Sequence, residues 1–185
     1  MKDSPFRSKE QKQAERALYE AIGEFAVAFE RIFGALRMAC VIMLQRRGLT
    51  CQPLADVLLA RRRDKELKEL AGAMYAEFRP DDEVGQKELA SLLAKIGNLT
   101  TQRNDYLHAV WTMSTRENNG TLDWSAFAVV LDKTLKKGRT VAYLAPEEFT
   151  RLAAEALKLQ VLANRFCRCV NQEYLNLAEE LTRAL

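Results

Sequence analysis

The stretch QRNDYLHAVW, residues 102–111, holds the only histidine of the chain and ends a long run of helical periodicity. From residue 89 onward the core-facing positions recur every three or four residues, as on one face of a helix. These positions are Leu89, Leu92, Ile96, Leu99, Arg103, Tyr106 and Val110. Arg103 therefore stands where the pattern requires an apolar side chain. Because a guanidinium stays charged, we expect it either to meet an internal carboxylate, such as Glu24 or Glu30, or to border a cleft.

The polar residues that follow Arg103 lie off this apolar stripe. Asn104, His108 and Trp111 are spaced four and three, which predicts a second line on the same helix. On an ideal helical wheel Arg103 and His108 are about 140° apart, so one helix does not aim both at one substrate. The reach of the arginine side chain, or a second copy of the helix, would have to bring them together. Small residues lead up to this line and indicate close packing by another helix or a second subunit: Ala90, Ala94, Gly97 and Thr101.

Length and composition favour one helical domain over residues 1–185. Hydrophobic residues make up 48% of the chain, enough for a sizeable core, and only eight glycines and four prolines are present. The formal net charge of +3 neither indicates nor excludes nucleic-acid binding. The amino-terminal sequence lacks the apolar segment of a signal peptide, and no uncharged run is long enough to span a bilayer. We therefore expect a cytoplasmic protein with no membrane partner.

The cysteines do not form a metal-binding pattern. Cys167 and Cys169 are separated by one residue, and Cys40 and Cys51 are isolated, so no CxxC spacing exists. We expect unpaired thiols on buried helix faces in a reducing compartment, and neither a metal site nor another cofactor.

The longest helix is predicted over residues 15–47, after a polar segment, residues 1–12, that we expect to be frayed. Gly48 fits the position that ends such a helix. The helix carries an apolar stripe at spacings of three and four: Leu18, Ile22, Phe25, Phe29, Ile32, Leu36, Cys40 and Met43. A second register holds only alanine: Ala14, Ala21, Ala28 and Ala35. These alanines favour tight packing inside one bundle over a dimer seam.

The remaining segments alternate helical patterns with turn signals. A short helix is predicted over residues 54–60. A run of arginines, residues 61–63, and neighbouring acids follow it and indicate a solvated face, with phosphate contact as the alternative. A helix ending at Arg79-Pro80 and the helix over residues 84–115 come next. Residues 119–145 lose the helical period, and the segments 126–131 and 139–144 predict a short hairpin or an irregular arm. The last helix is predicted over residues 146–182.

These elements predict an all-α fold, an up-and-down bundle of about four to five helices with a short hairpin or irregular arm before the last helix.

Residues 103–108, RNDYLH, resemble the signature of the HEPN superfamily: an arginine, a polar residue directly after it, and a histidine after four to six intervening residues. The resemblance covers these six residues. It implies an all-α bundle and, in many members, a metal-independent endoribonuclease with a site at a homodimer interface. Such members often have defence, toxin–antitoxin or RNA-processing roles. The resemblance assigns catalysis to Arg103, Asn104 and His108. Tyr106 and Trp111 are the adjacent candidates for contacting RNA, although Trp111 also fits a core position.

The residue types suit RNA cleavage without a metal. Such cleavage needs a base for the 2′-hydroxyl proton, an acid for the leaving 5′-oxygen and positive charge near the phosphorane. Histidine titrates near neutrality, and arginine presents a fork of donors to phosphate. A two-fold dimer would supply two histidines and two arginines to one cleft. The alternative function is a non-catalytic dimeric interaction or regulatory module of the same fold, and a regulatory protein partner is possible with either function.

Overall fold

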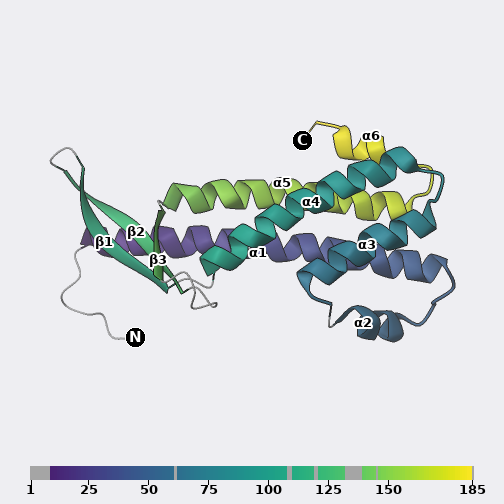
Figure 1. The fold of residues 1–185 in the computed structure, drawn as a ribbon, viewed down its shortest axis with the longest axis horizontal. Coiled ribbons are helices and arrows are strands. Elements are labelled where there is room, and N and C mark those ends of the chain that lie inside the picture. Colours follow the sequence, from purple (N-terminus) through teal and green to yellow (C-terminus); the bar gives the residue numbers. More distant parts are fainter. Residues whose placement is uncertain are drawn as a thin grey trace. The chain divides into compact units, whose positions relative to one another are not determined.

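The computed structural model describes residues 9–60, 62–107, 110–118, 121–131, 139–144 and 146–184 (Figure 1). The side chains of residues 10 and 105–146 are outside this description. The helices are α1 (Lys9–Arg46), α2 (Gln52–Ala60), α3 (Asp64–Phe78), α4 (Glu83–Leu107), α5 (Pro146–Asn171) and α6 (Leu177–Thr182). The strands are β1 (Val110–Asn118), β2 (Thr121–Leu131) and β3 (Arg139–Leu144). The chain divides into two compact units, residues 1–26 with 101–154 and residues 27–100 with 155–185.

The predicted helical fold is confirmed, since helices make up most of the described chain. The helix predicted to begin at residue 15 begins earlier, at Lys9, so the segment expected to be frayed is partly helical. The end of α1 is as predicted. Gly48 has a φ of 100°, its N–H donates to the Gln45 carbonyl over 3.0 Å, and the Leu49 N–H donates to the Leu44 carbonyl over 3.0 Å. This pair of bonds is a Schellman motif, which satisfies carbonyls that the helix leaves unpaired.

The arm contains more strand than predicted. The expected hairpin is present as β2 and β3, which pair antiparallel from Ala126 with Leu144 to Leu131 with Arg139. A third strand, β1, pairs antiparallel with the other side of β2, from Val110 with Val129 to Asn118 with Thr121. The prediction that the preceding helix continues to residue 115 is therefore wrong. Residues 110–115 are rich in β-branched and aromatic side chains, which favour a strand over a helix.

The predicted apolar stripes form the core. Of the stripe on α1, all residues except Ile22 are buried, and Ile22 is half-buried. The α4 stripe is buried at Leu89, Leu92, Ile96 and Leu99. Ala21, Ala28 and Ala35 are also buried by the chain itself, which favours the predicted tight packing within one molecule.

The unit formed by residues 27–100 and 155–185 is fastened at the carboxyl ends of its helices by arginines. Arg47 donates to the Glu77 carbonyl at the end of α3 over 2.8 Å. Arg46 bonds the Asn171 carbonyl at the end of α5 and pairs with the Glu173 carboxylate. Helices α1, α3 and α5 therefore end close together, where α4 begins, so α4 runs opposite to them (Figure 1). Cations here also complement the negative ends of the helix dipoles.

One carboxylate joins α3 to the start of α4. Asp82 accepts the Gly85 N–H over 2.9 Å with Oδ1, which is the N-cap bond of α4. Its Oδ2 accepts the Tyr75 hydroxyl over 2.6 Å. Tyr75 is 2% exposed, and its ring meets Phe166 of α5 edge-on at 5.6 Å between centroids. Gly85 is required because a Cβ there would collide with the Asp82 carboxylate.

The last helix is interrupted, contrary to the continuous helix predicted over residues 146–182. Helix α5 ends at Asn171 and α6 begins at Leu177. Asn176 is the N-cap of α6, and its Oδ1 accepts the Glu179 N–H over 3.2 Å. Tyr174 lies in the break between these two helices and is 82% exposed. Arg165 of α5 donates to the Glu180 and Arg183 carbonyls, which holds α6 against α5.

We predict that Tyr75→Phe lowers the free energy of unfolding by about 2 kcal/mol, because a hydrogen bond to a part-buried carboxylate is lost. Chemical denaturation followed by circular dichroism measures the change. Tyr19→Phe is the matched control, since Tyr19 is 64% exposed and should change stability by less than about 0.5 kcal/mol. Equal stabilities for the two variants would show that the Tyr75 hydroxyl does not support the fold.

Candidate functional site

The sequence motif lies at the carboxyl end of α4. Arg103 is half-buried, with its Nε shielded from solvent, and it precedes the last residue of the helix, Leu107, by one turn. Its Nη1 donates to Oδ1 of the exposed Asn104 over 3.1 Å. The arginine therefore extends from the apolar stripe toward the helix surface, and its guanidinium group fixes the orientation of the adjacent amide.

For the other predicted site residues, the structure describes the backbone of Tyr106 and Trp111 but not their side chains. His108, the predicted catalytic histidine, lies outside the described residues. Tyr106 is in the last turn of α4, and its side chain is likewise not described. Trp111 is not on the motif helix as predicted, because it belongs to β1 and pairs with Ala128 of β2. The predicted line through Asn104, His108 and Trp111 on one helix is therefore wrong at Trp111.

The two carboxylates considered as partners for Arg103 lie on the longest helix. Glu24 and Glu30 both belong to α1 and both are exposed, so neither is a core carboxylate. Among the residues whose burial the structure describes, no polar or charged residue is fully buried. A half-buried arginine avoids most of the desolvation cost that full burial would impose.

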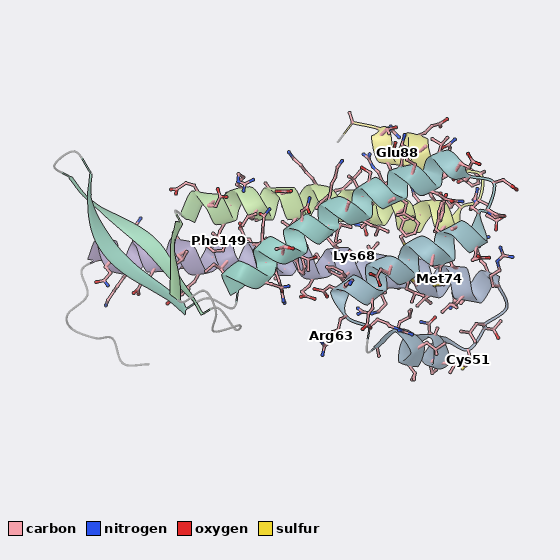
Figure 2. All side chains as sticks on the ribbon, in the orientation of Figure 1. Cys51, Arg63, Lys68, Met74, Glu88 and Phe149 are labelled. Atoms are coloured by element: carbon pink, nitrogen blue, oxygen red, sulfur yellow. The ribbon has the colours of Figure 1, made fainter. Side chains whose placement is uncertain are left out.

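The small-residue flank of α4 is largely uncovered by the chain. Ala90, Ala94 and Thr101 are exposed, as is Asn104 at the end of the flank. Gly97 is half-buried, and a Cβ there would come within 2.8 Å of Lys68 Nζ. Lys68 belongs to α3 (Figure 2). It lies in the same compact unit as Ala90, Ala94 and Gly97. We expected either another helix of this chain or a second subunit to pack against this flank. Within the chain, the described contact with another helix is at Gly97.

A cavity of about 510 Å³ lies elsewhere, between the turns formed by residues 78–82 and 173–176. Its polar groups already support the fold. Arg79 donates to the Glu173 carbonyl over 2.8 Å, Asp82 caps α4, and Asn176 caps α6. Sequence reasoning did not identify this cavity, because its walls come from turns far apart in the chain. We regard it as a structural junction.

Three of the cysteines, Cys40, Cys167 and Cys169, are disfavoured as catalytic nucleophiles or metal ligands, both of which act as thiolates. Burial raises the pKa of Cys40 to about 12 and that of Cys169 to about 11. Burial also raises the pKa of Cys167, whereas Cys51 is exposed. Among the residues that the structure describes, no three histidine, cysteine or acidic side chains are grouped to hold a metal ion.

Comparisons with other proteins leave the motif as the main indication of function. No protein-family model matches the sequence, and no curated protein or solved structure is significantly similar to it. Within the described ranges, no helix is both long enough and apolar enough to cross a membrane.

We predict that Cys51 reacts first when the folded protein is treated with an aromatic disulfide reagent at pH 8. Cys51 is exposed, whereas the raised pKa values of Cys40 and Cys169 keep those buried thiols protonated. Absorbance during labelling should show one fast thiol, and Cys51→Ser should remove the fast phase. A fast phase that persists in Cys51→Ser would show that one of the other thiols is accessible and reactive.

Proposed function

We propose that the protein is a metal-independent endoribonuclease of the HEPN type that acts in the cytoplasm as a homodimer. The observation that carries the proposal is the pair formed by Arg103 and Asn104 at the end of α4. The guanidinium group of Arg103 extends from the apolar stripe of α4 and lies next to the exposed side-chain amide of Asn104. The same two residues, with His108, are the ones that the HEPN resemblance assigns to catalysis.

The proposed reaction is intramolecular attack by the ribose 2′-oxygen on the adjacent phosphorus. The P–O bond to the 5′-oxygen breaks, which leaves a 2′,3′-cyclic phosphate and a 5′-hydroxyl end. One His108 takes the 2′-hydroxyl proton and the other protonates the departing 5′-oxygen. Arg103 stabilises the negative charge on the phosphorane through its guanidinium donors, and Asn104 orients substrate or the imidazole ring.

A second copy supplies the groups that one chain lacks. Each chain has one histidine, whereas the reaction uses a base and an acid. The exposed flank of α4 at Ala90, Ala94 and Thr101 supports close approach by another molecule beside the motif. A defence or toxin–antitoxin role, with a regulatory protein partner that restrains the activity, fits a cytoplasmic nuclease.

A non-catalytic interaction module of the same fold is the second candidate. The exposed apolar residues Leu54, Val57 and Leu58 of α2 favour it, because such residues mark contact surfaces. The two candidates differ in whether the motif cleaves RNA.

We predict that the purified protein cleaves single-stranded RNA in the presence of EDTA and leaves cyclic phosphate ends. His108→Ala and Arg103→Ala should each lower the rate at least about 100-fold, since each removes a group that acts on the reacting phosphate. Gel analysis of labelled RNA measures the rate. Lys95→Ala is the control because it removes an exposed cation from the same helix without touching the motif. Absence of cleavage, or equal activity in all variants, would favour the interaction module.

We further predict that the inactive His108→Ala protein lowers the activity of wild-type protein when the two share dimers. A mixed dimer holds only one His108, so its shared site lacks either the base or the acid. Equal amounts are unfolded and refolded together to exchange subunits, and the cleavage rate should fall to about a quarter of that given by the same total amount of wild-type protein. A rate of about one half, with mixed dimers shown by mass, would mean that each chain acts with its own histidine alone.

A further inference from the structure

Helix α2 presents apolar side chains on two sides. Ala55 and Leu59 are buried, whereas Leu54, Val57 and Leu58 are exposed, with Val57 at 70%. Spacings of three and four place the exposed three on one helix face. Three large aliphatic side chains on one face of a nine-residue helix form an exposed apolar patch of the kind that marks an interaction site.

An apolar groove of about 250 Å³ lies between α1 and α3 in the same unit. Its apolar lining comes from Met43 and Leu44 of α1 and from Ala73, Met74 and Phe78 of α3. Its two charged lining residues, Arg47 and Glu77, have opposite signs. The groove therefore offers an apolar floor with one positive and one negative group.

The start of α2 lies beside one end of the groove. Gln45 lies on α1 between the groove residues Leu44 and Arg47, and its amide donates to the side chain of Gln52 over 2.6 Å. Gln52 is the first residue of α2. Cys51, directly before α2, and the groove residue Met74 are labelled in Figure 2. The helix that carries the patch is therefore joined to the end of α1 that borders the groove.

We propose that the occupant of this groove is helix α2 of a second copy of the chain, exchanged reciprocally about a two-fold axis. Anchors at positions i, i+3 and i+4 are those by which an amphipathic helix occupies an apolar groove. A two-fold arrangement buries the helix and the groove of each molecule and closes the assembly.

Charge complementarity supports the second copy as the occupant. Asp56 is exposed beside Val57 and is opposite in sign to Arg47 of the groove, whose guanidinium also donates to the Glu77 carbonyl. The exposed Arg62 and Arg63, just after α2, are opposite in sign to Glu77.

This contact is independent of the proposed nuclease activity and is separate from the flank of α4. Its test measures association of the chain with itself, whereas the proposed function is tested by RNA cleavage. A failure of one proposal is therefore distinguishable from a failure of the other.

The first experiment measures the mass of the full chain by light scattering after size exclusion. Val57→Glu combined with Leu58→Glu should halve the mass of the wild-type assembly, because it places charges in the apolar contact. Both residues are exposed, so the fold is retained, and circular dichroism checks it. Val84→Glu on α4 is the matched control, since Val84 is 64% exposed and lies outside the patch and groove. An unchanged mass in the double variant would overturn the proposal.

The second experiment identifies the surfaces by disulfide formation in a Cys51→Ser background. Val57→Cys and Ala73→Cys proteins are mixed and oxidised with copper phenanthroline. The mixture should give a cross-linked dimer containing one of each, because α2 of one copy lies in the groove of the other. Cross-linking of Val57→Cys only with itself would indicate direct pairing of two α2 helices and overturn the exchange. Absence of any cross-link, with Val84→Cys as the background control, would also overturn it.

Discussion

The Asp82 carboxylate holds together the start of α4 and the surrounding core. With one oxygen it satisfies a helix N–H that would otherwise lack an acceptor, and with the other it accepts the hydroxyl of a buried tyrosine. Burial and the neighbouring carboxylate raise the pKa of Tyr75 above its usual value, so the tyrosine remains a donor. The Tyr75 ring also contacts Phe166 of α5. Tyr75 of α3 therefore connects the start of α4, through Asp82, with α5. These contacts set the direction in which α4, the helix that carries Arg103 and Asn104, leaves the core.

Much of the helical part of the fold follows from local signals in the sequence. The stripes of α1 and α4 are buried where their spacing predicts, and Gly48 ends α1 because only a residue tolerant of positive φ fits there. The errors come from places where short-range and long-range preferences compete. The apolar period that ends in Val110 continues the helical spacing by chance, while strand pairing with β2 decides the conformation.

The site was harder to predict than the fold. Arg103 stood out because it breaks an apolar pattern, and its half-buried position and bond to Asn104 fit that observation. Trp111 was misplaced because the length of the motif helix was overestimated. The groove between α1 and α3 had no sequence signal, since it depends on how two helices pack. The exposed face of α2 was visible only as apolar content, because sequence alone does not show which of its two apolar faces is covered.

The arginines at the helix ends have a consequence for how the protein meets a polyanion. Arg46, Arg47, Arg79 and Arg165 donate to main-chain carbonyls, so these four positive charges are held in internal structure. With a formal net charge of only +3, the molecule generates a weak long-range field. Counterions would be displaced in proportion to the phosphates that the cations contact, so the salt dependence of binding would count those contacts. Because long-range attraction is weak, ligands are discriminated mainly by short-range contacts, and complexes that fit poorly dissociate quickly.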